Sequence, residues 1–165
     1  MSRVLYFAYG SNMSERRLQA RAPSARRVGL GQLAGHRLAF HKVGFRDGSA
    51  KCDIARADGE TVHGVLFELA AHDLRALDDC EGAGHGYDRV ELSVASESQA
   101  SVLAYAYRAT RIDPTLRPFT WYLRHVLAGA REAGLPAAYI EALAAVEAMA
   151  DPNRQREHEE LAVYE

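Results

Sequence analysis

Residues 5–13, Leu-Tyr-Phe-Ala-Tyr-Gly-Ser-Asn-Met, join an apolar, aromatic run to an abrupt stop at Gly10-Ser11-Asn12. Aromatic residues favour a pleated strand, whereas Gly, Ser and Asn favour turns and the N-terminal caps of helices. The next segment, from Ser14 to Leu18, has the residues of a helix start. This order predicts a buried first strand, a tight turn and then a helix.

The turn after this strand is a candidate binding site. The first N–H groups of a helix have no intrahelical partner, and the helix dipole favours negative charge beside them. Such a turn can hold a carboxylate or a developing oxyanion. Gly10 would let a ligand approach the backbone closely, because it has no Cβ. A buried strand followed by an ordinary capped helix is the structural alternative, and the turn alone does not decide between the two.

Composition narrows the class of protein. A chain of 165 residues with 48% apolar and 25% charged residues is typical of one globular domain. The formal net charge is −2 and the charges are mixed along the chain, so we expect no nucleic-acid or membrane partner. The arginines at positions 16, 17, 21, 26 and 27 form a local basic cluster, which we interpret as a solvated helix face.

Apolar runs, cysteines and histidines indicate where the protein is located and whether it binds a metal. No apolar run approaches the ~18–20 residues of a membrane span, and Val4–Tyr9 is too short for a signal peptide. A cytoplasmic protein is therefore expected, and Cys52 and Cys80 fit reduced thiols. Neither cysteine belongs to a Cys-x-x-Cys pair, and the seven histidines lack metal-ligand spacing, so no metal site is expected.

The rest of the chain predicts an α+β fold. Strands are expected over residues 28–33, 36–41, 52–56, 61–69, 89–95 and 102–107, with turns at 46–49 and 57–60. Helices are expected over 13–21 and 71–78, from Pro118 to a stop at Gly134, and over 138–148. We assign residues 1–150 to one domain and 151–165 to a charged C-terminal tail, either solvated or forming a last short helix.

Glu81 is the strongest catalytic candidate. It follows Leu77-Asp78-Asp79-Cys80 at the end of a predicted helix and precedes glycines at 82, 84 and 86. Acids at this end oppose the helix dipole, so something other than helix stability can explain their presence. The alternative is one more surface acid. The sequence around Ser11 is no Gly-x-Ser-x-Gly elbow, and the glycine run is no dinucleotide fingerprint.

These stretches together resemble the gamma-glutamylcyclotransferase family. The similarity covers about Leu5 to Val146: Tyr-Phe-Ala-Tyr-Gly-Ser-Asn-Met, Leu77-Asp78-x-x-Glu81-Gly82 with Gly86-Tyr87, and Ala130–Pro136 with Tyr139. It is weakest over residues 45–60 and in the tail. The resemblance implies a small mixed β-barrel with packed helices, with Glu81 as general acid/base. It also implies that a group of residues binds the γ-glutamyl substrate: Tyr6, Phe7, Ala8, Tyr9, Gly10, Ser11, Asn12, Tyr87 and Tyr122.

The implied reaction is cyclisation of a γ-glutamyl compound to 5-oxoproline by its own α-amine. It needs no metal, no cofactor and no side-chain nucleophile. The turn at residues 9–12 would bind either the substrate α-carboxylate or the oxyanion. The leaving group stays open between an amino acid, the amine of a γ-glutamylamine and a γ-glutamyl-capped biosynthetic intermediate. A non-catalytic binding protein on the same scaffold is the alternative from another class, and the oligomeric state is also open.

Overall fold

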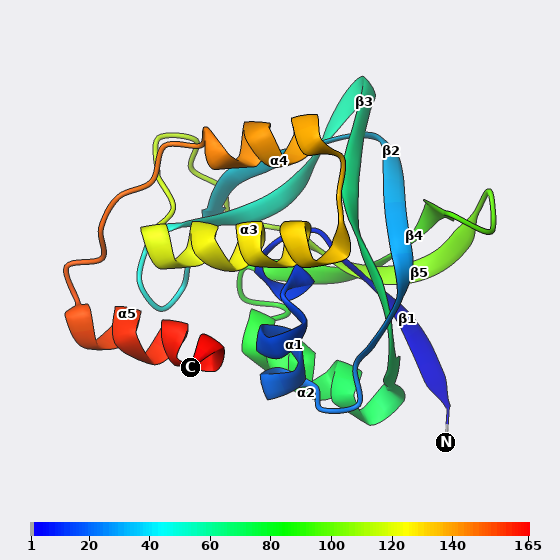
Figure 1. The fold of residues 1–165 in the computed structure, drawn as a ribbon, viewed down its shortest axis with the longest axis horizontal. Helices are drawn as coiled ribbons and strands as arrows, with labels where there is room; N and C mark the ends of the chain where they lie inside the picture. Colours follow the sequence, from blue (N-terminus) through cyan, green and yellow to red (C-terminus); the bar gives the residue numbers. More distant parts are fainter. Residues whose placement is uncertain (1) are drawn as a thin grey trace.

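The computed structural model describes residues 2–165, and its sheet closes on itself as a barrel (Figure 1). The strands are β1 (Arg3–Ala8), β2 (Arg26–Val43), β3 (Ala50–Ala70), β4 (Tyr87–Ser96) and β5 (Val102–Ala109), in the spatial order β1-β3-β2-β4-β5. Neighbouring strands are antiparallel except β1 and β5, which pair in parallel through Tyr6 and Tyr105. The predicted α+β fold with a small mixed barrel is confirmed.

Helical segments pack around this barrel. They are η1 (Ser11–Met13), α1 (Glu15–Arg21), α2 (Ala71–Glu81), α3 (Thr120–Ala133), α4 (Ala137–Ala144), α5 (Arg154–Leu161) and η2 (Ala162–Tyr164). In Figure 1, α3 and α4 run alongside one another, while α1 and α2 lie below them. No helix within residues 2–165 is both long and apolar enough to cross a membrane.

Strands β2 and β3 are longer than the sequence predicts. Two strands with a glycine turn between them were expected at residues 28–41, but β2 is continuous there and Gly35, at φ 72°, lies where its register shifts. The turn expected at 57–60 lies inside β3, where the pairing jumps from Ala34↔Thr61 to His36↔Arg56. Bulges absorb the extra residues, so the turn-forming glycines bend these strands without ending them.

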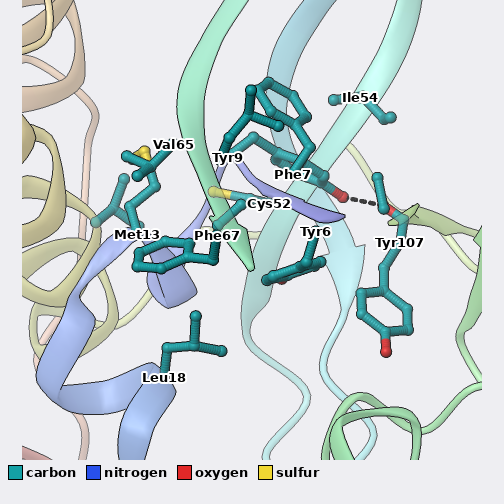
Figure 2. Packing of buried hydrophobic residues seen from close by; sticks show 14 of the residues in the cluster. Tyr6, Phe7, Tyr9, Met13, Leu18, Cys52, Ile54, Val65, Phe67 and Tyr107 are labelled. Atoms are coloured by element: carbon teal, nitrogen blue, oxygen red, sulfur yellow. Dashed lines mark hydrogen bonds between the residues drawn. The ribbon is translucent and has the colours of Figure 1, made fainter. Parts of the chain in front are cut away.

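The first strand is buried on both faces. Phe7 is fully buried, and a Cβ added at Gly31 or Gly64 would lie 2.9 or 2.7 Å from its ring. These two glycines therefore make room for the ring. Met13 of η1 and Leu18 of α1 belong to the same core, where Figure 2 shows them near Phe67 of β3. The second half of the strand, Tyr6–Ala8, and the turn that follows it are thus held in place by packing.

The C-terminal residues fold back onto the barrel's helices. Residues 154–161 form α5, so the last-short-helix alternative is the one that the structure contains. Asp151, which is buried, anchors it: its carboxylate accepts hydrogen bonds from Trp121 Nε1 at 2.8 Å and from Arg156 Nε and Nη2, both at 2.6 Å. The hydrogen bonds from Arg156 and Trp121 lower the pKa of Asp151 to about 2.

Asp151→Asn should lower the free energy of unfolding by about 2–3 kcal/mol at pH 7, since hydrogen bonds to a charged group are lost. The folded protein keeps the carboxylate charged down to about pH 2, whereas the unfolded chain protonates it near its ordinary pKa of 3.8. Its contribution is therefore complete above about pH 4 and disappears as the pH falls toward 2. Urea unfolding at several pH values would measure this, with the exposed Asp58→Asn as control; an equal loss in both variants would contradict the role of Asp151.

Candidate active site

Glu81 lies where the end of α2 meets α1. It is the last residue of α2, and Gly82, at φ 67°, ends the helix in the left-handed conformation that glycine tolerates. Its Oε1 accepts hydrogen bonds from Asn12 Nδ2 at 2.7 Å and from Arg21 Nη1 at 3.0 Å. These two hydrogen bonds fix the orientation of the carboxylate.

The turn after β1 meets Glu81 through Asn12. Its side-chain amide donates to Tyr6 Oη at 3.1 Å as well as to Glu81, and its carbonyl oxygen accepts from Arg21 at 3.4 Å. Asn12 is buried in η1, a single 3-10 turn that the hydrogen bond from Met13 N to Gly10 O closes at 3.1 Å. The strand–turn segment and the end of α2, 69 residues apart in the chain, therefore form one hydrogen-bonded unit.

A small inner cavity opens at this unit. Most of the predicted site residues line it, together with two others; the lining is Tyr6, Tyr9, Gly10, Ser11, Asn12, Cys52, Glu81, Tyr87, Tyr107 and Tyr122. Phe7 and Ala8 do not line it, because their side chains are buried in the barrel core. The alternation of a strand explains part of this, since Tyr6 and Phe7 point to opposite faces. Cys52 and Tyr107 are the two lining residues that are not among the predicted site residues.

Tyrosine hydroxyls surround the cavity. Tyr87 Oη donates to the carbonyl of Cys52 at 2.6 Å, and Cys52 N–H donates to Tyr122 Oη at 2.9 Å. Tyr9 donates its hydroxyl hydrogen to the carbonyl of Tyr107, the contact that is dashed in Figure 2. Burial raises the pKa values of Tyr87 and Tyr122 well above their ordinary value of 10. These hydroxyls therefore stay protonated at neutral pH and act as hydrogen-bonding groups.

The other cavity side chains are poor proton acceptors near neutral pH. Burial raises the pKa of the Cys52 thiol to about 12, so the nucleophilic thiolate is scarce. Ser11 Oγ accepts a hydrogen bond from Arg17 Nε at 3.2 Å, and an arginine is no base. Burial likewise raises the pKa values of Tyr6 and Tyr107. Glu81 is the carboxylate among the side chains that line this cavity.

The interpretation of the basic cluster as a solvated helix face is wrong for two of its arginines. We expected a solvated face, but Arg17 is buried and pairs with Glu160 and His125 Nε2, while Arg21 pairs with Glu81. Sequence reasoning missed both because a helix of seven residues with three arginines looks exposed on every side. The only signal was their spacing of four residues, which places both on one face of α1.

Known proteins resemble this chain along most of its length. The model of the AIG2-like family matches residues 61–143. The human protein named gamma-glutamylcyclotransferase is 32% identical over 151 residues, covering 87% of this chain and 78% of its own. The chain belongs to the gamma-glutamylcyclotransferase family. The mouse protein of the same name is 31% identical with the same coverage.

A solved structure named gamma-glutamyl cyclotransferase superposes with a TM-score of 0.88 at 26% identity, covering 99% of both chains. The likeness thus includes the barrel and the helices that surround the cavity. The resemblance inferred from the three sequence stretches is confirmed, and so is the expected class of protein, an enzyme of the gamma-glutamylcyclotransferase type.

Proposed function

We propose that this protein converts a γ-glutamyl amino acid or γ-glutamyl amine into 5-oxoproline and the free amine. One observation carries the proposal: Glu81, the carboxylate of the cavity lining, lies on the same hydrogen-bonded unit as the turn at residues 9–12. A γ-glutamyl cyclisation needs one such group and a set of hydrogen-bonding neighbours.

The substrate brings its own nucleophile in this reaction. Its α-amine attacks the γ-carbonyl, the new C–N bond closes a five-membered ring, and the amide C–N bond to the leaving half breaks. Well-oriented intramolecular attack can reach effective molarities of ~10⁵–10⁸ M, equivalent to about 7–11 kcal/mol. The protein has to hold the chain of the substrate bent and move two protons from the α-nitrogen to the leaving nitrogen.

Glu81 serves both proton transfers in succession. It takes a proton from the α-ammonium, which frees the lone pair that attacks, and gives this proton to the leaving nitrogen. The second proton that the ring nitrogen must lose follows by the same route to the released amine, which departs as an ammonium, so the carboxylate is regenerated after each turnover. Arg21, 3.0 Å from Glu81 Oε1, and Asn12, 2.7 Å from it, orient the carboxylate. The N–H groups of the turn at residues 9–12 bind one of the two anionic groups, the α-carboxylate or the oxyanion.

The tyrosines shape the γ-glutamyl pocket in this proposal. Tyr87 and Tyr122 are fixed by the two backbone groups of Cys52, so their rings present rigid walls. Tyr6 extends the wall toward Asn12. Because Glu81 and predicted substrate-binding residues from β1, η1, β4 and α3 converge on this cavity, we assign it to the γ-glutamyl half of the substrate. A cytoplasmic location remains part of the proposal, in keeping with the two free cysteines.

The proposal is tested by mass-spectrometric detection of 5-oxoproline from a panel of γ-glutamyl amino acids and γ-glutamyl amines. We expect release from at least one member, and none from the same compound N-acetylated on its α-amine. Release of glutamate in place of 5-oxoproline would replace cyclisation by hydrolysis. Tight binding of the panel without any product would favour the non-catalytic binding protein and overturn the proposed activity.

A further inference from the structure

An outer cleft continues from the inner cavity and shares Ser11, Glu81, Tyr87 and Tyr122 with it. If the γ-glutamyl half occupies the inner cavity, the leaving half occupies this cleft. Positive charge dominates its walls. Three acidic side chains line it, against six cationic ones: Arg17, Arg21, Lys42, Arg46, Lys51 and Arg156.

Four of the six cations are already neutralised by an ion pair. The pairs are Arg17 with Glu160, Arg21 with Glu81, Lys51 with Asp47 and Arg156 with Asp151. For Lys42 and Arg46, no carboxylate of the described residues 2–165 lies within ion-pair distance. The cleft therefore has two cations available for a ligand.

Lys42 is the more unusual of the two because it is only 2% exposed. Its ammonium lies 4.4 Å from the centre of the Tyr87 ring and beside the backbone of Gly86, where an added Cβ would be 3.0 Å from Nζ. Burial lowers the pKa of Lys42, and the attraction of Glu81 opposes that shift. A buried ammonium without a carboxylate has lost much of its hydration, so an anion that reaches it binds with little further desolvation of the lysine.

The end of β2, which carries Lys42, and the loop that follows it, which carries Arg46, hold both cations near the catalytic candidate. The ring of Phe45 lies against Gly82, the residue after Glu81, at 3.1 Å from the position of an added Cβ. Lys42 Nζ is 5.7 Å and the Arg46 guanidinium 5.3 Å from the centre of that ring. Phe45 itself is 51% exposed, an apolar surface beside two charges. The arrangement offers a leaving group one apolar contact and two cationic ones.

We propose that Lys42 and Arg46 select a leaving half with two carboxylates, so that the preferred substrates are γ-glutamyl dipeptides whose second residue is glutamate or aspartate. The buried Lys42, nearer the cavity, binds the α-carboxylate of the second residue. Arg46, exposed at the mouth, binds its side-chain carboxylate. This inference rests on the proposed function, because it assigns the outer cleft to the leaving half of the cyclised substrate.

The test compares kcat/KM for γ-Glu-Glu, γ-Glu-Gln and a γ-glutamyl alkylamine in the wild-type protein and in Lys42→Met and Arg46→Gln. Glutamine is nearly isosteric with glutamate, so the first ratio isolates one charge. A charge-assisted contact should make γ-Glu-Glu about tenfold better than γ-Glu-Gln in the wild type. Arg46→Gln should bring this ratio close to one, and Lys42→Met should lower the preference for both dipeptides over the alkylamine.

A matched control removes one positive charge from β2, the strand that contains Lys42. Arg37 is an exposed residue of β2 that does not line the cleft, so Arg37→Gln should keep the wild-type ratios. Equal kcat/KM for γ-Glu-Glu and γ-Glu-Gln in the wild type, or ratios unchanged in both cleft variants, would overturn the subsite while leaving cyclisation intact. If no compound yields 5-oxoproline, the proposed activity fails. The subsite is then tested separately by calorimetry, with the ratios of the affinities for the same three compounds in place of the ratios of kcat/KM.

Discussion

Replacing Glu81 by glutamine is expected to lower kcat for 5-oxoproline release by about 10²–10⁴-fold, the usual contribution of a positioned acid/base group. Glutamine keeps the Oε1 atom that accepts the hydrogen bonds from Asn12 and Arg21, so the two contacts that orient the side chain can persist. What is lost is the ability to take and return a proton. Steady-state kinetics on the best substrate of the panel would measure the loss.

A neighbouring acid supplies the control for Glu81. Asp79 is exposed in the same turn of α2, and Asp79→Asn removes the same formal charge without touching the cavity. We expect Asp79→Asn to retain wild-type kcat and both variants to unfold at similar urea concentrations. Turnover by Glu81→Gln at the wild-type rate would exclude Glu81 as the proton-transfer group. An equal loss of kcat in both variants would indicate a general effect of charge.

The local order of the site was predictable from sequence because it depends on nearest neighbours. Aromatic residues followed by Gly10-Ser11-Asn12 predict a strand that ends in a turn, and the structure has β1 followed by η1. The glycine after Glu81 predicts the end of a helix, and Gly82 caps α2. In both places the backbone preference of one or two residues determines the structure.

Long-range pairings were not predictable in the same way. Arg21 and Glu81 are 60 residues apart, and nothing in either segment indicates that the guanidinium of a helix with three arginines turns inward. Likewise, Gly35 marks a bulge in β2 where a turn was expected, because pairing with β3 outweighs the local preference of one glycine. Tertiary contacts decide such cases, since each local signal is worth only about 1 kcal/mol or less.

Lys42, which has no ion-pair partner within the described part of the chain, is a second feature of the site that the sequence did not predict. It directly follows the strand predicted over residues 36–41, and nothing in its sequence context indicates burial or a role in the site. Only the packing of Tyr87 and Gly86 against its side chain makes it a buried cation at the cleft. A residue's chemistry in a site thus depends on partners that its own neighbourhood in the chain does not reveal.

Gly129→Ala is expected to lower the free energy of unfolding by about 3 kcal/mol or more, the upper range for overpacking a core. Gly129 lies inside α3, where the intrinsic preference of a helix would favour alanine by up to about 1 kcal/mol. The packing around Gly129, however, makes the substitution to alanine destabilising. A Cβ at Gly129 would lie 2.2 Å from the carbonyl carbon of Met13 and 2.3 Å from the nitrogen of Ser14.

Both close atoms belong to the backbone, so no side-chain rotation can relieve the contact. Either α3 moves away from the barrel or the turn at residues 11–14 shifts, and that turn carries Asn12, which holds Glu81 at 2.7 Å. We therefore expect Gly129→Ala to lose activity on the best γ-glutamyl substrate even at temperatures where it remains folded. Urea unfolding and kinetics on one preparation would separate the two effects.

Gly29 offers the matched control, because an added Cβ there meets no atom within 4 Å and its φ is not positive. Gly29→Ala should change the free energy of unfolding by no more than about 1 kcal/mol and leave kcat unchanged. A Gly129→Ala protein as stable as Gly29→Ala would mean that α3 does not approach the turn this closely. A destabilised but fully active Gly129→Ala protein would show that the turn keeps its position, and that α3 is the element that moves.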